Sequence, residues 1–372
     1  MTFDDIRPYS DAEIPAAVGR IAELDVLPQI MKYIYPGTSP AEAIGRLCKV
    51  HTVRELQAEF MNPAIQRIAA ATTEGFTFSG LNRLRRDGNY LFVSNHRDIT
   101  LDAFFLQHLL FEHKGDTSYI VFGENLLAMP AAADIFRCNK MIGMSRGGSP
   151  RTFYNSLRHL SEYIHQLVVE ERHSVWIAQN NGRAKDGIDL TAPAMVKMLT
   201  LGSDAAPQQA LADLHIVPVS ISYEWDPCDV LKANELAASK SGHYVKAPGE
   251  DFNSVVTGIV GRKGMVHLAV GQPLTPDELV PLDREHVDVH VANVIDRRIV
   301  HNYRLMPSNF AAYDQLNGTS RYRHRYSAST QRELQRRLDL LPDAEQRGLL
   351  LAMYANPVSS SLMLTRRNET QN

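Results

Sequence analysis

The sequence contains little cysteine: of 372 residues, only Cys48, Cys138 and Cys228 are cysteines, and they lie far apart without a C-x-x-C pair. A disulfide framework and a zinc knuckle both need sets of suitably spaced cysteines, so the sequence excludes these two classes. Sparse, scattered cysteines are typical of proteins in a reducing compartment. We therefore expect a cytoplasmic protein.

Long apolar runs are also absent. No stretch reaches the about 18 uninterrupted apolar residues that a membrane-spanning helix needs, and the first residues are acidic, without the apolar core of a signal peptide. We therefore expect any membrane contact to be peripheral. The formal net charge of -3, from 39 basic and 42 acidic residues, gives no electrostatic case for a nucleic-acid partner.

The motifs of nucleotide-binding enzymes and of zinc proteases are missing. The sequence has no G-x-x-x-x-G-K-[ST], no G-x-G-x-x-G and no H-E-x-x-H. His286 and His290 lie four residues apart in a predicted helix over residues 284–301, but no nearby cysteine or clearly placed carboxylate completes a metal-ligand set. A solvated helix face is favoured for this pair, and no metal or bound cofactor is expected.

What is present is the composition of a folded globular chain, with 44% hydrophobic and 22% charged residues. Residues 1–74 predict an N-terminal helical segment, since apolar residues recur there at helical spacing. A short helix between Pro28 and Pro36 carries apolar side chains almost all round and one lysine, Lys32. Such a helix either packs in a core or touches a membrane surface.

Residues 75–305 alternate between short apolar runs and helix-period segments. The runs predict strands at residues 76–79, 90–94, 119–122, 141–144, 175–178, 216–223 and 265–270. Strands that alternate with helices are typical of an α/β layered domain with a mixed, largely parallel sheet and flanking helices. We predict that architecture for this domain.

Residues 306–372 form a C-terminal extension that is irregular and basic, and partly helical. Six arginines lie between residues 321 and 337 against one acid, Glu333, and an apolar stretch follows at residues 349–354. This pattern predicts either an arm that lies on anionic lipid or a solvated face over a packed terminal helix.

The strongest candidate for chemistry lies where the predicted strand at residues 90–94 ends on a polar cluster and a helix follows. Open α/β sheets place their working residues at such turns. His96 stands there with two carboxylates, Asp98 and Asp102, close by in the sequence. A histidine with an orienting carboxylate is the minimum for general-base activation of a hydroxyl. We take these three as candidate catalytic residues, and spacing alone does not decide which carboxylate meets the imidazole.

Four segments resemble, in order, the motifs of the glycerolipid acyltransferase family, which comprises the glycerol-3-phosphate and lysophosphatidate acyltransferases. The first motif of that family is a histidine and an aspartate on a strand-to-helix turn, as in His96 and Asp102. The other three are an apolar strand ending in Arg146, a strand ending in Asn181-Gly182-Arg183, and an apolar strand with Pro218. The similarity spans at least residues 90–223.

The resemblance implies transfer of an acyl group to a hydroxyl. In such an enzyme the histidine takes the proton of the acceptor hydroxyl, the oxygen attacks the thioester of acyl-CoA or acyl carrier protein, and arginines hold the acceptor's phosphate. Arg146 and Arg183 are the candidate phosphate clamp, and Asn181, Gly182 and Pro218 are further substrate-binding candidates. Apolar residues available to line an acyl slot are Phe104, Phe105, Leu126, Leu127 and Met129.

The sequence also departs from the family pattern. Five residues rather than four separate His96 from Asp102; we favour Asp102 as the partner because it precedes the apolar run at residues 103–106, as the family's aspartate does, while Asp98 is placed to cap the helix. Asn181 replaces the acid of the third motif, and Arg183 stands one place early. An acceptor other than glycerol phosphate, or a reduced or lost activity, would follow from these changes.

Two other functions compete. Residues 143–147 match the G-x-S-x-G nucleophile pattern of serine hydrolases around Ser145, with Asp226 or Asp229 and then His267 in the required order. A homologue that binds acyl chains or lipid without turnover is the second alternative.

The sequence favours a glycerolipid O-acyltransferase of phospholipid biosynthesis. We expect it to use glycerol phosphate or a lysophospholipid as acceptor and to work as a peripheral protein at the cytoplasmic face of the inner membrane.

Overall fold

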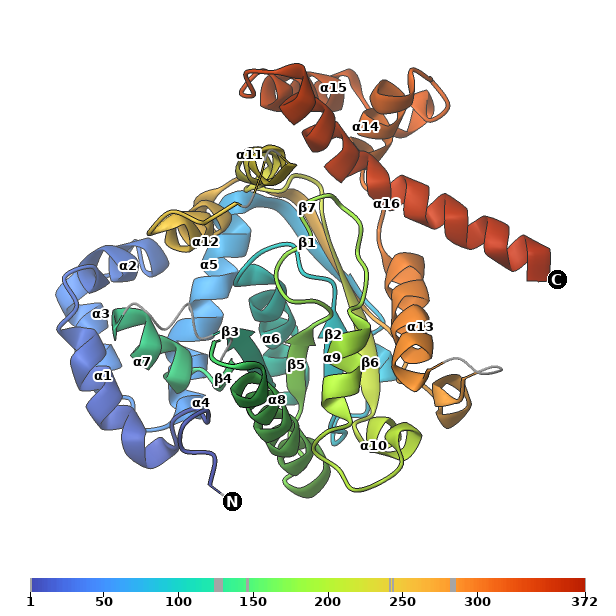
Figure 1. The fold of residues 1–372 in the computed structure, drawn as a ribbon. Helices are drawn as coiled ribbons and strands as arrows, with labels where there is room; N and C mark the ends of the chain where they lie inside the picture. Colours follow the sequence, from blue (N-terminus) through green and yellow to red (C-terminus); the bar gives the residue numbers. More distant parts are fainter. Residues whose placement is uncertain are drawn as a thin grey trace.

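One mostly parallel sheet forms the centre of the molecule. The computed structural model describes residues 2–123, 130–144, 147–240, 242, 244–281 and 286–371. These residues build a seven-stranded sheet in the order β1-β7-β6-β2-β5-β3-β4 (Figure 1). The strands are β1 Thr73–Ser79, β2 Leu91–Ser94, β3 Tyr119–Gly123, β4 Met141–Met144, β5 Val175–Ala178, β6 Ile216–Tyr223 and β7 Gly264–Val270.

The predicted α/β class and all seven predicted strands are confirmed. Every neighbouring pair of strands is parallel except β6 and β7, which run antiparallel. The sequence located the strands because each is a short apolar run between turn residues. β1 begins at Thr73, three residues before the predicted start at Phe76, and pairs from there with Gly264 of β7.

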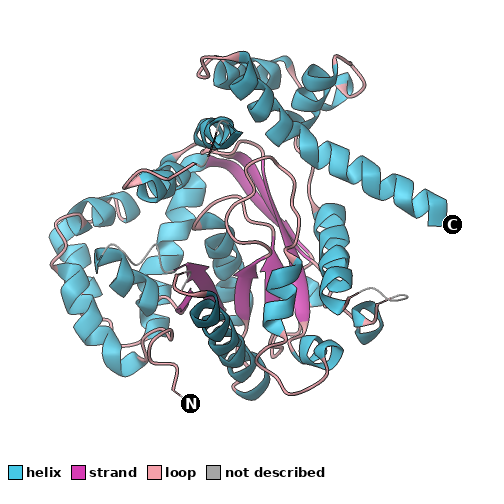
Figure 2. Ribbon diagram, viewed as in Figure 1, coloured by secondary structure: helices cyan, strands magenta, loops and turns pink. Residues whose placement is uncertain are grey.

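Helices cover both faces of the sheet (Figure 2). They are α1 Ile14–Ala22, α2 Leu27–Ile34, α3 Pro40–Leu47, α4 Val53–Leu56, α5 Asn62–Thr72, α6 Leu101–Lys114, α7 Pro130–Cys138, α8 Pro150–His165, α9 Pro193–Leu199, α10 Pro207–Asp213, α11 Asp229–Lys240, α12 Glu250–Val260, α13 Val287–Asn302, α14 Pro307–Asn317, α15 Ala328–Leu338 and α16 Ala344–Gln371. Short π-helical segments, Gln57–Met61 and Gln166–Glu170, follow α4 and α8.

Alternate residues of each central strand enter opposite cores. In β2, Leu91 and Val93 join the cluster under α8, α9 and α13, whereas Phe92 joins the cluster under α5 and α6. All four residues of β2 are buried, as expected for a strand covered by helices on both faces. β2 is the middle strand of the seven, so its carboxyl end lies near the centre of the sheet. The chain continues from this end into His96.

The N-terminal helices pack on one another. Leu27 and Met31 of α2 are buried in a cluster with α1, α3 and α4, and Lys32 is exposed. These two residues thus serve as core, whereas Ile30, Tyr33 and Ile34 are partly exposed. Among the described residues, no helix has the length and apolar character needed to cross a bilayer.

The sequence left two alternatives open for the C-terminal extension, an arm on anionic lipid or a solvated face over a packed terminal helix, and the structure shows packed helices here. α14, α15 and α16 pack around a common core that includes Phe310, Leu334 and Tyr354 (Figure 1). Two of the arginines are held by acids: Arg336 pairs with Glu333, and Arg337 pairs with Asp229 on α11. The arginines are close together in the sequence, which suggested one basic surface. In the structure, Arg336 and Arg337 are neutralised by acids, and Arg337 is also buried.

Candidate active site

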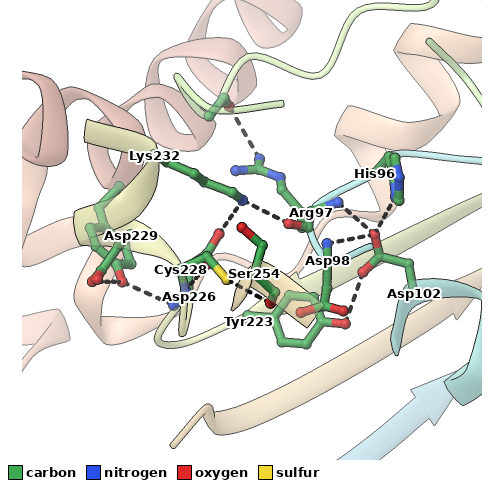
Figure 3. Close-up of polar contacts among 12 residues, drawn as sticks. His96, Arg97, Asp98, Asp102, Tyr223, Asp226, Cys228, Asp229, Lys232 and Ser254 are labelled. Carbon is green, nitrogen blue, oxygen red and sulfur yellow. Dashed lines mark hydrogen bonds and ion pairs between the residues drawn. The ribbon is translucent and has the colours of Figure 1, made fainter. Parts of the chain in front are cut away.

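The turn after β2 brings His96 and Asp102 together. The Nδ1 atom of His96 lies 2.9 Å from Oδ2 of Asp102, and the imidazole is 14% exposed while the carboxylate is fully buried. Because a carboxylate accepts hydrogen bonds, Nδ1 carries the proton and Nε2 is left with its lone pair. The structure therefore places Asp102, the carboxylate that the sequence favoured, against the imidazole (Figure 3).

Three further donors fix the Asp102 carboxylate. Oδ2 accepts the main-chain N–H groups of Arg97 at 2.5 Å and Asp98 at 2.9 Å, and Oδ1 accepts the Tyr223 hydroxyl at 2.8 Å. Burial raises the pKa of Tyr223 well above its ordinary value, and the Asp102 carboxylate adds to the rise. The phenol therefore stays protonated and holds Asp102 in place from the end of β6.

Asp98 does a different job. Its carboxylate accepts the main-chain N–H groups of Thr100 at 3.0 Å and Leu101 at 2.9 Å, which are unpaired donors at the start of α6. Burial raises the pKa of Asp98, and the neighbouring Asp102 carboxylate raises it further. Asp98 thus caps α6, and His96 is contacted by Asp102 instead.

The third motif folds over His96. The N–H of Ala184 donates to the carbonyl of His96 at 2.8 Å, so residues 182–184 run beside the turn that follows β2 and carries His96. Gly182 and Arg183 line the same cleft as His96, whereas Asn181 is exposed and lines a neighbouring cavity. The structure brings two of the three predicted residues of this motif to the cleft.

The cleft has a volume of about 820 Å³, including space open to solvent. Its lining includes the apolar residues Phe104 and Trp176, and the Trp176 ring lies edge-on to the imidazole at 5.9 Å between centroids. Three cations, Arg183, Lys185 and Lys246, also line the cleft. The cleft can therefore hold a molecule with an apolar part and an anionic part.

Arg183 differs from the other cations of the cleft. Lys185 pairs with Glu235 and Lys246 pairs with Asp251. Within the described part of the chain, Arg183 forms no such ion pair, and its buried Nη1 atom has no hydrogen-bond partner. Buried carboxylates near the guanidinium attract it through space, but a buried nitrogen without a hydrogen-bond partner is unfavourable, so an anionic ligand would complement this position.

A second, apolar cavity adjoins the cleft over the ends of β3 and β5. Its volume is about 870 Å³ including open space, and its lining includes Met144, Leu157 and Met198. The two cavities share the residues Val121, Phe122, Gly123, Ala178 and Asn180.

Other candidates lie elsewhere or outside the described residues. Pro218 is inside β6, in register with Val93, and is not among the described residues that line the cleft. Of the predicted acyl-slot residues, Phe104 lines the cleft, but Phe105 is fully buried and stacks on Phe76. Arg146, Ser145, Leu126, Leu127 and Met129 lie outside the described residues.

The serine hydrolase alternative is contradicted by the sheet order. Met144 ends β4 at one edge of the sheet, and His267 is on β7, five strand spacings away, or about 24 Å. The ring nitrogens of His267 contact the hydroxyls of Thr77 and Ser79 instead. The candidate acids are also occupied: Asp226 pairs with Lys232, and Asp229 with Arg337.

His286 and His290 are not arranged as a metal-binding pair. His286 is exposed just before the helix, and Nε2 of the buried His290 lies 3.1 Å from the carbonyl of Glu278. Among the described residues, no group of three or more potential ligands is placed to hold a metal ion.

Sequence reasoning missed Tyr223, Trp176 and Lys232. Tyr223 stands at the end of the predicted strand at residues 216–223, and the end of a parallel strand is a signal that could have found it. Trp176 is inside a predicted strand, where an aromatic residue is most often plain core. Lys232 had no local signal at all.

Part of the chain matches a known protein family. Residues 75–222 match the protein-family model described as Acyltransferase, and this range contains all four sequence motifs. A search of curated proteins found no match. The crystal structure of the 1-acyl-sn-glycerophosphate acyltransferase PlsC from Thermotoga maritima aligns with 77% of this chain and 94% of that chain, at 14% identity and a TM-score of 0.39.

Proposed function

We propose that this chain moves a fatty acyl group from a thioester to a lipid-precursor hydroxyl. The match of residues 75–222 to the Acyltransferase family model supports an acyltransferase. The observation that supports this most directly is the His96–Asp102 pair in a cleft whose lining includes both apolar residues and cations. A general base beside such a cleft suits an amphiphilic substrate.

The chemistry follows from the geometry of the pair. Nε2 of His96 removes the proton of the acceptor hydroxyl as the oxygen attacks the thioester carbonyl, and Asp102 stabilises the imidazolium that forms. The carbon–sulfur bond then breaks, and the imidazolium returns its proton to the leaving thiolate. The products are an ester and a free thiol, and the step requires no bound cofactor. Either acyl-CoA or acyl carrier protein can supply the thioester.

We propose an anionic acceptor, glycerol phosphate or a lysophospholipid, because Arg183 offers an unpaired guanidinium to the cleft. Arg146 remains a second candidate for this role. The apolar cavity beside the cleft supports a long acyl chain as the donor group. Asn181 is exposed at the edge of that cavity, where a neutral amide can still bond a hydroxyl.

The proposal is tested by measuring thiol release from acyl-CoA and acyl carrier protein of several chain lengths, with and without glycerol phosphate and lysophospholipids. We expect release that requires an acceptor and a KM for the donor that falls as the chain lengthens. Donor binding without acceptor-dependent release would instead support the non-catalytic homologue. Release that ignores the acceptor would indicate a hydrolase.

Replacing Arg183 by glutamine should raise the KM for an anionic acceptor by about 10- to 100-fold, because one charge-assisted hydrogen bond contributes about 1.5–3 kcal/mol. We expect kcat to change much less. The matched control is an uncharged acceptor, monoacylglycerol, whose KM should be the same in both proteins. An equal rise for both acceptors would mean that Arg183 shapes the cleft and does not bind the charge.

We also propose a peripheral membrane contact at the cytoplasmic face of the inner membrane, through α12. Phe252, Val256 and Val260 are exposed and recur every four residues, so they share one face of that helix. The first turn of α12 and the loop before it contribute Asp251 and Lys246 to the cleft. An apolar face beside the cleft mouth suits a substrate that resides in a bilayer.

Substituting serine for Phe252 and Val256 together should weaken co-sedimentation with phospholipid vesicles by about tenfold, since less apolar area enters the interface. The control is Leu316→Ser on α14, another exposed apolar residue on a different helix. Equal binding of all three proteins would place the membrane contact elsewhere.

A further inference from the structure

A lysine far from the cleft motifs in sequence reaches the catalytic turn. Lys232 of α11 is 1% exposed, and its Nζ donates to the main-chain carbonyl of Arg97 at 2.7 Å. Its second partner is the Asp226 carboxylate, with which it forms a buried ion pair. Figure 3 shows Lys232 between these two groups, on the side of the turn away from His96.

The carbonyl that Lys232 holds belongs to the same peptide group as the N–H of Asp98. That N–H donates to Oδ2 of Asp102, the oxygen that also contacts Nδ1 of His96. The oxygen of this peptide group therefore accepts a hydrogen bond from an ammonium, and its N–H donates one to a carboxylate. Such an arrangement polarises the peptide, strengthens the bond to Asp102 and fixes the plane of the turn.

Helices outside the matched residues 75–222 hold Asp226, the ion-pair partner of Lys232, in place. Arg337 of α15 donates to the carbonyl of Asp226 at 3.1 Å and to the carboxylate of Asp229 at 2.6 Å. The Tyr354 hydroxyl of α16 accepts the N–H of Asp226 and donates to Asp229. Burial by itself would raise the pKa of Asp226, but Lys232 lowers it below its ordinary value, so the Asp226 carboxylate stays charged.

The C-terminal helices also touch the other side of the turn. The Arg97 guanidinium pairs with Asp189 at 2.6 Å and donates to the carbonyl of Gly187. Gly187 has φ +78°, and a Cβ there would lie 2.0 Å from the carbonyl oxygen of Met353 on α16. Close packing of α16 thus fixes the loop that holds the Arg97 side chain.

We propose that Lys232 is a positioning residue for the acyl transfer: it orients the peptide between Arg97 and Asp98, and through it Asp102 and His96. An apolar side chain would fill the same space without the cost of burying an ion pair, so filling space alone does not account for the ammonium. The C-terminal helices, outside the matched residues 75–222, hold the Asp226 segment with which this lysine pairs. This inference rests on the proposed function.

The test compares three full-length variants. Lys232→Met removes the ammonium and keeps the length of the side chain, and we expect kcat to fall by about 10- to 100-fold with little change in KM. Asp226→Asn breaks the same buried ion pair and should lower the melting temperature similarly, but it leaves the bond from Lys232 to Arg97 and should cost kcat only a few-fold. Lys240→Met, at the exposed end of α11, should behave as wild type.

A second readout does not depend on turnover. The Nδ1 proton of His96, held by Asp102, should give a downfield NMR resonance in histidine-labelled protein, and Lys232→Met should shift or broaden it while Asp226→Asn leaves it in place. Unchanged kcat and an unchanged resonance in folded Lys232→Met would overturn the inference. Equal losses in Lys232→Met and Asp226→Asn would mean that the pair matters for stability alone. An inactive wild type would refute the proposed function, and the resonance would still decide the role of Lys232.

Discussion

Replacing His96 by alanine should reduce acceptor-dependent thiol release by about 10²- to 10⁴-fold, the contribution expected of a general base. The imidazole is the titratable group whose free nitrogen lies on the cleft wall with a buried carboxylate behind it. Without it, the acceptor hydroxyl would have to attack the thioester while still holding its proton. The measurement is kcat for the preferred acceptor at saturating donor.

The matched control for His96→Ala is His267→Gln. His267 is also largely buried, but both of its ring nitrogens contact hydroxyls and it lies on β7 outside the cleft. Its substitution should leave turnover unchanged. If His96→Ala keeps full activity, or if His267→Gln abolishes it, the proposed site is wrong. Unfolding of either variant would be seen in its melting curve, and its rate would then be expressed per amount of folded protein.

The second large effect is expected for Asp102→Asn, which should lower kcat by about 10²- to 10³-fold. The Oδ2 position accepts three N–H donors, so the amide oxygen of asparagine will take that position and keep the histidine tautomer. The amide nitrogen then faces the Tyr223 hydroxyl, which can accept as well as donate. What is lost is the negative charge that stabilises the imidazolium, and this predicts a smaller effect than the about 10⁴-fold seen where the tautomer is also wrong.

Asp98→Asn is the comparison that decides between the two carboxylates. Asparagine caps a helix about as well as aspartate does, so the start of α6 should remain intact and kcat should fall only a few-fold. Should Asp98→Asn abolish turnover while Asp102→Asn does not, the partner of His96 has been assigned incorrectly.

The sequence located the site well because its signals are local. A buried strand that stops on Asn95 and His96 marks the carboxyl end of β2 without any knowledge of the rest of the chain. The run of apolar residues after Asp102 likewise marks α6, and it favoured Asp102 over Asp98 before any distance was known. Helical and strand periodicities depend on neighbours within a few residues, which is why the seven strands were found from the sequence.

The order of the strands is a different matter. β2 lies between β6 and β5, and the nearest of these begins about 80 residues further along the chain. Which strands pair is decided by the competition of many long-range contacts, and no local pattern records it. The hydrolase alternative failed for this reason. Its candidate residues follow the right order in sequence, but β4, which precedes the candidate serine, is at one edge of the sheet and His267 is on β7, five strand spacings away.

The sequence also could not predict which charges of the C-terminal extension are exposed. The arginines between residues 321 and 337 look like one basic surface in the sequence, yet Arg337 is 7% exposed and pairs with Asp229, more than 100 residues away. Burial turns that arginine into a structural residue, because a buried charge needs a partner.

By itself, the sequence determined the fold class, the strands, the histidine and the favoured carboxylate, since each follows from residue type and short-range spacing. The tertiary structure alone decided that Asp102 meets the imidazole, that Tyr223 and the turn N–H groups hold it, that Arg183 is left without an ion pair and that Lys232 reaches the catalytic turn. These contacts join side chains and peptide groups that come together only when the sheet has formed and its helices have packed on it. No single stretch of sequence therefore contains them.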